Sequence, residues 1–294
     1  MNYLKDCTLC PRNCHVDRTR SVGLCGATSR IRIAYYDSFF YEEPVISGTH
    51  GSGTIFFSHC NLKCIFCQNK KISTGGYGKD ISRKHFQDIC LKLQDMGCHN
   101  INLVTPTPYA PLIVSSIQKI QNQLKIPIVY NTSSYENIST IRLLDGIVDI
   151  YLADFKYYDS SLSNKYSKVS DYFEVASSSI DEMFLQVGPI QMSGDLMKKG
   201  VIVRILLLPG EVEDAKRIVS YLYQKYGDQI FISIMNQYTP LEEYPYSNLN
   251  HPVSSIEYDE LVNYSYDLGV RNAFIQEGDT QKDSFIPNFS IKNL

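Results

Sequence analysis

The sequence contains no tract of basic residues and no long apolar run, and these absences exclude classes of partner. Its 28 Lys and Arg residues and 31 Asp and Glu residues are intermixed, with a formal net charge of −3. Without a basic patch there is no electrostatic footprint for nucleic acid. No stretch approaches the roughly 18 apolar residues of a membrane span, and the opening MNYLKDCTLC has no apolar signal core. We therefore expect a cytoplasmic protein that binds neither nucleic acid nor membranes.

A dinucleotide-binding glycine fingerprint is also missing after the first predicted strand, although the rest of the pattern is that of an α/β protein. From about residue 53, short apolar runs alternate with helical periodicity. The runs predicted as strands are 53–58, 100–104, 127–131, 148–154, 201–208, 230–235 and 270–276. Strands separated by helices form crossover units and a parallel sheet. We therefore expect a partial or full β/α barrel over residues 53–294, with a C-terminal extension.

The helices between these strands are predicted from apolar residues at spacings of three and four. One helix follows a capping Ser82. Its predicted apolar face consists of Phe86, Ile89, Cys90, Leu93 and Met96. Residues 160–188 are predicted to be helical with an irregular break.

Residues 1–52 do not show this alternation of strands and helices, and we expect them to form a small Cys-rich N-terminal lobe. Their cysteines are Cys7, Cys10, Cys14 and Cys25, and the whole chain has nine. In a chain without a secretory signal, cysteines indicate reduced thiols and metal binding before disulfides. The spacing fits a four-thiolate zinc site, with His15 as a substitute ligand, or a second iron–sulfur cluster. Free thiols are the third alternative, and Cys90 and Cys98 are predicted to be core residues.

A second group of cysteines lies in SHCNLKCIFCQN, where Cys60, Cys64 and Cys67 have the spacing C-x3-C-x2-C. Structural zinc sites and ordinary electron-transfer clusters use four protein ligands. Three thiolates on one loop predict a metal centre with one open coordination position. A zinc site with a distant fourth ligand is the alternative.

This motif resembles that of the radical S-adenosylmethionine superfamily. The resemblance implies a four-iron–four-sulfur cluster and S-adenosylmethionine, whose reductive cleavage gives a 5′-deoxyadenosyl radical. Phe66, before the third cysteine, matches the aromatic residue near the adenine. Blocks such as CNLKCIFCQN, VDIYLADFKYY and VRILLLPG resemble uncharacterised iron–sulfur relatives of pyruvate formate-lyase-activating enzyme.

The same resemblance assigns cofactor-binding residues on the loops that follow the strands. Asp154 and Lys156 match the D-x-K pair of activating enzymes. A Gly-Gly-Glu motif is replaced by VTPTPY, where the hydroxyls of Thr105 and Thr107 or backbone carbonyls could accept the cofactor ammonium.

Three further polar residues are candidates for cofactor binding. Arg204 lies within an apolar strand, so it needs a carboxylate partner, of the cofactor or of the protein. Asn131 and Ser133 follow the third strand and fit contacts to ribose or carboxylate as well as turn formation.

The activity that the resemblance implies is abstraction of hydrogen from a glycine of a glycyl-radical protein, with flavodoxin or ferredoxin as the reductant. Radical modification of another peptide or of a small molecule is the enzymatic alternative. Two alternatives are not enzymes. One is an iron–sulfur electron carrier, and the other is a zinc-stabilised binding protein on a degenerate barrel. A carrier needs neither an open iron nor the Asp154–Lys156 pair.

Overall fold

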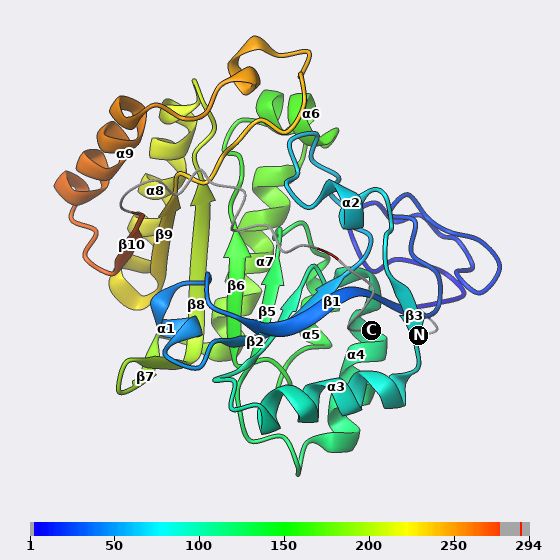
Figure 1. The fold of residues 1–294 in the computed structure, drawn as a ribbon. Helices are drawn as coiled ribbons and strands as arrows, with labels where there is room; N and C mark the ends of the chain where they lie inside the picture. The colour runs from blue at the N-terminus through cyan, green and yellow to red at the C-terminus, as the bar shows by residue number, and fades with distance from the viewer. Residues whose placement is uncertain (1–2, 277–288, 290–294) are drawn as a thin grey trace.

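The computed structural model of the protein describes residues 3–276 and 289. Within them the strands of one mixed sheet follow the order β10-β9-β8-β6-β5-β4-β2-β1-β3, with β7 paired to β8 (Figure 1). The strands are β1 (Ile31–Phe39), β2 (Ser52–Phe57), β3 (Lys79–Ile81), β4 (Ile101–Val104), β5 (Ile128–Thr132), β6 (Ile150–Asp154), β7 (Gln191–Ser193), β8 (Leu196–Leu206), β9 (Phe231–Met235) and β10 (Ala273–Ile275).

Helices connect the strands and cover one face of the sheet. They are α1 (Pro44–Ser47), α2 (Lys70–Ser73), α3 (Arg83–Asp95), α4 (Ala110–Ile120), α5 (Ile138–Arg142), α6 (Ser160–Ser167), α7 (Tyr172–Val187), α8 (Val212–Tyr226) and α9 (Ser255–Leu268). Three 3-10 helices lie at Thr107–Tyr109, Gly227–Gln229 and Ser247–Asn250. None of the helices in the described residues is long and apolar enough to cross a membrane.

All seven predicted strands form, and they run parallel from β2 through β4, β5, β6, β8 and β9 to β10. The end strands β10 and β3 are not paired with each other in the described residues, so the barrel is open. The prediction of a partial β/α barrel is confirmed. The irregular break predicted within residues 160–188 separates α6 from α7.

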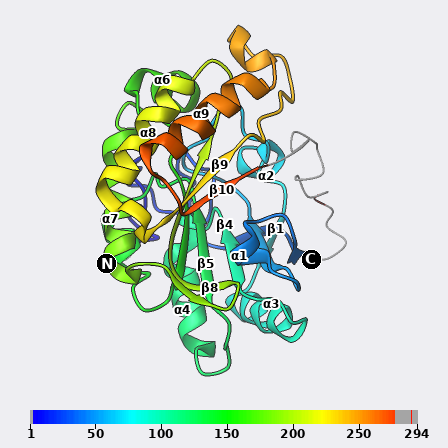
Figure 2. The ribbon, with the colours of Figure 1, turned by 90° about the vertical axis from the view of Figure 1, so that its left-hand side faces the viewer.

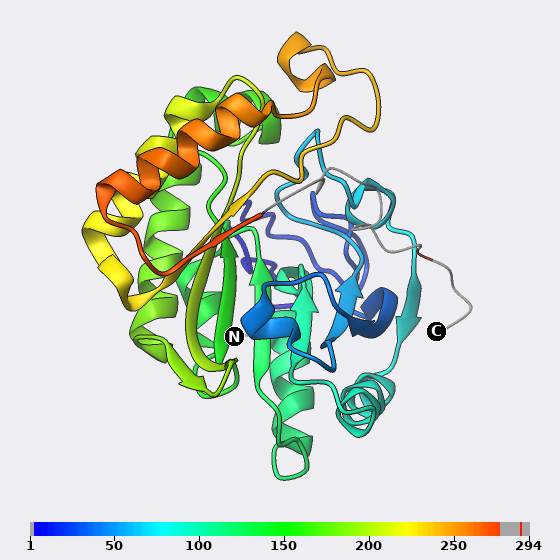
Figure 3. The ribbon, with the colours of Figure 1, turned by 60° about the vertical axis from the view of Figure 1, so that its left-hand side comes forward.

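The N-terminal segment contributes to this sheet as well. Strand β1, within the expected lobe, pairs antiparallel with β2 and with β3. The short helix α1 follows it and packs against β8 on the face opposite to α7 and α8 (Figures 2 and 3). The division of the chain at residue 52 stays a prediction, and β1 belongs to the main sheet.

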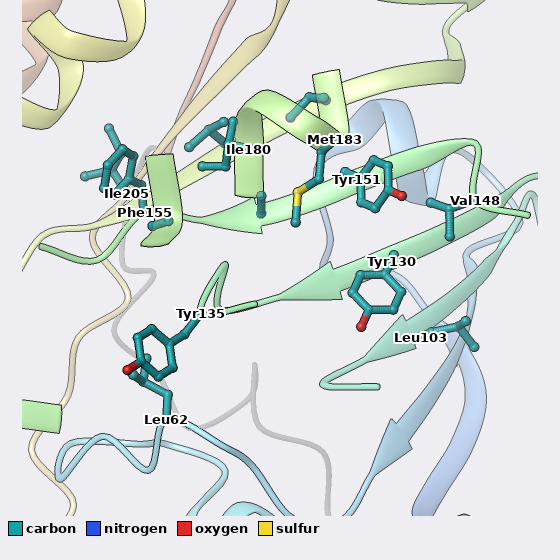
Figure 4. Close-up of a cluster of buried hydrophobic side chains, with 14 of the residues drawn as sticks. Leu62, Leu103, Tyr130, Tyr135, Val148, Tyr151, Phe155, Ile180, Met183 and Ile205 are labelled. Carbon is teal, nitrogen blue, oxygen red and sulfur yellow. The ribbon is translucent and has the colours of Figure 1, made fainter. Parts of the chain in front are cut away.

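The outer layer of the core lies between the sheet and the helices. Alternate residues of each strand point there, and they are almost all apolar or aromatic. Tyr130 of β5 and Tyr151 of β6 are neighbours, with ring centroids 6.0 Å apart, and Met183 of α7 lies above the strands (Figure 4). Because the outward residues of the strands are apolar, the strands could be predicted from the sequence as short apolar runs.

One detail of the helix predictions is wrong. Ser82 caps α3 as expected, because its hydroxyl accepts a hydrogen bond from the His85 amide. Phe86 and Leu93 are buried, but Met96 is 47% exposed. The helix ends at Asp95, so Met96 is no longer held on the apolar face.

The inner face of the sheet changes character along the strands. On β5, β6 and β8 its lower part is apolar, where Ile46 of α1 packs with Val129, Ile150, Leu152 and Ile202. Toward the carboxyl ends the inward residues become polar. They include Asn131, Asp154, Arg204 and Ser233. The barrel is thus closed by α1 at one end and hollow at the other, where ligand sites of such folds lie.

Candidate active site

A cavity of about 520 Å³ occupies the open end of the barrel. Cys60, Cys64 and Cys67 all line it, as do Asp154 and Lys156 at the end of β6. A cavity of this volume is in the range of sites that hold one drug-sized ligand. The trio predicted from its spacing and the pair predicted from the strand end therefore share one chamber.

The cysteine loop turns sharply because two of its residues adopt left-handed backbone conformations. His59 has a φ of 73° and Lys63 a φ of 57°. Hydroxyl groups from two other segments donate hydrogen bonds to the sulfurs: Ser73 to Cys67 at 3.3 Å and Ser167 to Cys64 at 3.1 Å. The thiols are thereby oriented before any metal is bound.

The thiols of the trio suit a metal cluster better than free nucleophilic chemistry. Burial raises the pKa of Cys60 to about 12 and also raises the pKa of Cys67, while the Lys156 ammonium partly offsets the second effect. Such thiols stay protonated at neutral pH unless a metal displaces the proton. Three thiol ligands at a polar cavity fit a four-iron–four-sulfur cluster with one iron facing the cavity.

In the described residues, no three His, Cys, Asp or Glu side chains converge as ligands of a single metal ion. A cubane needs no such convergence, because each cysteine binds a different iron. The observation therefore leaves the fit of the trio to a cluster unaffected.

A buried charge network extends from the trio across the inner face of the sheet. Lys156 Nζ donates to Asp154 Oδ2 at 2.8 Å, and Arg204 Nε donates to Asp154 Oδ1 at 3.0 Å. The other guanidinium nitrogens of Arg204 donate to Glu42 at 3.0 Å and Asn131 at 2.8 Å. Two carboxylates of the protein itself, Asp154 and Glu42, are therefore the partners of Arg204 that the sequence predicted in general form.

Burial and neighbouring charges act in opposite directions on these groups. Burial would raise the pKa of Asp154, but the charges of Lys156 and Arg204 outweigh it and the pKa is lowered. Burial disfavours the charged form of Lys156, and the Asp154 carboxylate more than compensates, so its pKa is raised. For Glu42 burial dominates despite Arg204, and its pKa is raised to about 7. Asp154 and Lys156 are thus held ionised next to the cysteines.

Two carboxylates of the cavity were missed by sequence reasoning. Glu42 and Glu43 lie between β1 and α1, in the segment expected to be a separate lobe, and both line the cavity. The signal for them was YEEP, an acidic pair directly before a proline in an aromatic and apolar run. Only the fold of β1 and α1 across the barrel brings this pair to the inner face.

The remaining predicted cofactor residues divide into two groups. Phe66, Thr105, Asn131 and Ser133 line the cavity. Phe66 is 5% exposed and meets the ring of Tyr166 edge-on at 6.1 Å between centroids.

Thr107 lies elsewhere, and the structure does not bring it to the other candidates. It is buried and donates a hydrogen bond to Glu136 at 2.6 Å, outside the set of lining residues. The chain turns at Thr105, which has a φ of 57°, and this turn directs Thr107 away from the chamber.

The four N-terminal cysteines lie outside the cavity lining. They interact electrostatically with one another: Cys10 with Cys7 and Cys25, and Cys25 with Cys7 and Cys14. Burial raises the pKa of Cys10 to about 12 and raises that of Cys25. The thiols are near neighbours, but none of the described groups is preformed for a single metal ion. The second metal site stays a prediction.

The cysteine-bearing loops of the N-terminal segment pack against the trio. Arg12 donates to the carbonyls of Asn61 and Leu62, inside the trio loop, at 3.2 and 3.3 Å. A side chain at Gly26, next to Cys25, would bring its Cβ to 2.9 Å from the His59 ring. The two cysteine sets are therefore held against each other by direct contacts.

Comparison with known proteins agrees with this architecture. Residues 54–222 match the family model described as the Radical SAM superfamily. The uncharacterized protein MJ0674 of Methanocaldococcus jannaschii is 31% identical over 272 residues, which cover 87% of this chain and 73% of that protein.

Solved structures show the same fold at low sequence identity. Methylornithine synthase (PylB) has a TM-score of 0.52 at 16% identity, over 81% of this chain and 77% of that chain. SuiB of Streptococcus suis, bound to its precursor peptide SuiA, has a TM-score of 0.51 at 16% identity, over 74% of this chain and 46% of that chain. On the match of the family model and of its relative, the chain belongs to the radical S-adenosylmethionine superfamily.

Proposed function

We propose that the protein is an enzyme that reductively cleaves S-adenosylmethionine and abstracts hydrogen from a substrate, in the manner of glycyl-radical-enzyme activating enzymes. The observation that carries the proposal is the meeting of Cys60, Cys64 and Cys67 with the Asp154–Lys156 pair in one cavity. An electron carrier would need neither the chamber nor a buried ion pair at its rim.

The residues of the chain have distinct roles in this proposal. Cys60, Cys64 and Cys67 hold a four-iron–four-sulfur cluster, which when reduced supplies the electron that cleaves the sulfonium of S-adenosylmethionine. Lys156 binds the carboxylate of S-adenosylmethionine by a charge-assisted hydrogen bond. Asp154 keeps Lys156 ionised and accepts from a hydroxyl or ammonium, and Phe66 forms an apolar wall.

Other polar residues of the lining complete the proposed cofactor site. Thr105, Asn131 and Ser133 line the cavity, and we assign to them hydrogen bonds to the ribose or to the methionyl group. Arg204 is engaged by Asp154 and Glu42, so it acts by positioning Asp154. Thr107 is left out of the cofactor site, because its hydroxyl is engaged by Glu136.

The proposed partners follow from this chemistry. A low-potential one-electron donor, flavodoxin or ferredoxin, supplies the reducing equivalent. The substrate is a glycyl-radical-type protein, from whose backbone glycine hydrogen is abstracted. Modification of another peptide or of a small molecule on the same scaffold is the alternative.

The test is anaerobic reconstitution with iron and sulfide, followed by reduction in the presence of S-adenosylmethionine. The proposal predicts a brown protein that forms 5′-deoxyadenosine and methionine in equal amounts. A colourless, air-stable protein that contains zinc and leaves S-adenosylmethionine intact would contradict it.

We also propose that Cys7, Cys10, Cys14 and Cys25 bind a second metal, either zinc or an auxiliary iron–sulfur cluster. What supports this is the mutual proximity of the thiols and their contact with the trio loop through Gly26 and Arg12. Four thiolates and a metal would also stabilise a segment with few apolar residues of its own.

A further inference from the structure

Two buried hydroxyl groups form a chain that ends on the sulfur of Cys64. The Ser167 hydroxyl donates to Cys64 Sγ at 3.1 Å, and the phenol oxygen of Tyr157 lies 2.7 Å from Ser167 Oγ. Both side chains are buried, and Tyr157 also interacts with the Cys64 thiol. The roles proposed above assign no function to either hydroxyl.

The hydroxyl of Ser167 is directed at the cysteine loop and not at its own helix. Ser167 is the last residue of α6. Serines in helices commonly donate to a carbonyl of the preceding turn, as Ser177 of α7 does to Phe173 at 2.6 Å. Within the described residues, the partners of the Ser167 hydroxyl are instead Tyr157 and Cys64. The side chain therefore serves the trio.

Backbone contacts hold the end of α6 against the cysteine loop. The Ile65 amide donates to the Tyr166 carbonyl at 2.9 Å. Arg12 donates to the carbonyls of Ser167 and Leu62 at 3.1 and 3.3 Å. These contacts lie on both sides of the cysteine that Ser167 reaches, so the hydroxyl and the sulfur are fixed relative to each other.

The ring of Tyr157 is fixed as well. It meets the ring of Tyr172 edge-on with centroids 5.2 Å apart, and the ring of Phe66 edge-on at 6.5 Å. Tyr157 directly follows Lys156 at the end of β6. The phenol is therefore held in place by its neighbours, with its oxygen at Ser167.

The direction of the hydrogen bonds follows once a metal is bound. A cysteine that binds iron has lost its proton, so its sulfur can only accept. A serine hydroxyl has one proton to donate and can accept at the same time. Ser167 must then donate to Cys64 and accept from Tyr157. Consecutive hydrogen bonds polarise each other, so the phenol strengthens the donor that the sulfur receives.

We propose that Tyr157 and Ser167 are positioning residues that raise the reduction potential of the cluster held by the trio, acting through Cys64. One-electron reduction adds a negative charge to a cluster, and hydrogen bonds to its sulfur ligands strengthen as that charge grows. The donor chain therefore favours the reduced form and eases electron transfer from the reductant. The inference rests on the cluster of the proposed function and concerns how readily that cluster is reduced.

The experiment is an anaerobic redox titration of the reconstituted full chain with dithionite and mediators, without S-adenosylmethionine. The reduced cluster is measured by electron paramagnetic resonance. Ser167→Ala should shift the equilibrium about tenfold toward the oxidised form, which for one electron lowers the midpoint potential by about 59 mV. Tyr157→Phe should lower the potential by a smaller amount, because the Ser167 donor remains.

Matched controls remove equivalent groups that do not reach a sulfur. Ser163→Ala removes another buried hydroxyl of α6, which donates to backbone carbonyls. Tyr166→Phe removes a phenol that donates to Glu211 at 2.8 Å. Both variants should keep the wild-type potential. Ser167→Thr restores a hydroxyl and should recover most of the shift caused by Ser167→Ala.

A wild-type potential in Ser167→Ala, or an equal shift in the two controls, would overturn the inference. If Ser167→Ala assembles no cluster, Tyr157→Phe decides, because it leaves Ser167 in place, and a wild-type potential there would overturn the role of the chain.

Failure here can be distinguished from failure of the proposed function. A cluster whose potential shifts as expected, but which forms no 5′-deoxyadenosine, would contradict the proposed function and support the donor chain. A cluster that forms 5′-deoxyadenosine with the same potential in wild type and Ser167→Ala would do the reverse. A wild type that assembles no cluster would contradict both.

Discussion

The two cysteine sets of this protein differ in what surrounds them. The trio of Cys60, Cys64 and Cys67 lines a cavity of about 520 Å³, whereas none of the four N-terminal cysteines belongs to that lining. Burial raises the pKa of both Cys67 and Cys10; the Lys156 ammonium partly offsets this rise at Cys67, while the Glu136 carboxylate adds to it at Cys10. At Cys25 of the N-terminal set, burial raises the pKa and the Arg18 guanidinium opposes this rise.

This difference separates a reactive site from a structural one. A cluster that must bind a second molecule needs an open chamber and a cation that favours thiolate and carboxylate ligands. The trio has both features, and the open chamber is the one that the N-terminal set lacks. The N-terminal set has a packed surrounding held by Arg12, whose guanidinium also donates to the carbonyls of Ser167 and Lys168. We therefore propose catalysis for the trio and stabilisation or electron relay for the N-terminal set.

The largest expected effect is the loss of activity when a cysteine of the trio is replaced. Replacing Cys60, Cys64 or Cys67 singly by Ala should abolish formation of 5′-deoxyadenosine, because each thiolate holds one iron. The product is measured by chromatography after anaerobic reconstitution and reduction. Cys98→Ala, at a buried cysteine outside the cavity lining, serves as the control and should stay active. Activity retained in any one of the three variants would refute the assignment.

The second prediction concerns the other side of the comparison. With all three trio cysteines replaced, the purified protein should still contain zinc or iron bound by Cys7, Cys10, Cys14 and Cys25. Elemental analysis gives the metal content, and additional replacement of Cys10 should reduce it. A triple variant with neither metal would mean that the N-terminal cysteines are free thiols.

The third prediction uses the carboxyl group next to the N-terminal set. Burial raises the pKa of Glu136 to about 7 from 4.5, although Thr107, Thr132 and Tyr130 donate to it. Because the folded pKa is the higher one, its stabilising contribution is present below pH 4.5 and is lost as pH rises through 7. A shift of this size corresponds to about 3 kcal/mol.

Urea unfolding at pH 5 and pH 8 checks this. The wild type should lose about 2.5 kcal/mol more of its free energy of unfolding between these pH values than Glu136→Gln does. The exposed Glu243→Gln should behave as the wild type. An equal loss in Glu136→Gln would show that another group governs the pH dependence.

The smallest expected effect concerns Lys156, the cation that distinguishes the trio. A charge-assisted hydrogen bond to the cofactor carboxylate is worth about 1.5–3 kcal/mol. Lys156→Ala should therefore weaken S-adenosylmethionine binding roughly tenfold to hundredfold. Cluster assembly should be preserved, because the thiolates come from another loop, and Lys168→Ala, at an exposed lysine, should bind normally. Equilibrium binding to the reconstituted proteins decides, and undiminished affinity would remove Lys156 from the cofactor site.

Much of the fold could be predicted because its signals are local. Seven strands were identified because their outward residues pack under helices and leave short apolar runs, as Tyr130 and Tyr151 illustrate. The trio was identified because its three ligands lie on one loop. Asp154 and Lys156 were assigned because they match the D-x-K pair of activating enzymes at the end of a predicted strand.

The features that could not be predicted depend on long-range folding. Glu42 and Glu43 reach the cavity only because β1 pairs with β2 and α1 then closes the barrel. Thr107 faces Glu136 because of a backbone turn at Thr105 that no residue pattern announces. Residue patterns thus located the loops that follow the parallel strands, but they did not give the direction of each side chain on those loops or the segment that crosses the barrel.

The central claim is that the trio leaves one iron of its cluster open to S-adenosylmethionine. The direct measurement is electron paramagnetic resonance of the anaerobically reconstituted and reduced protein, with and without S-adenosylmethionine. We predict the signal of a reduced four-iron cluster that changes when S-adenosylmethionine is added and that is missing from the variant lacking all three trio cysteines. A cluster signal that S-adenosylmethionine leaves unchanged, or one that persists unaltered without the trio, would contradict the claim.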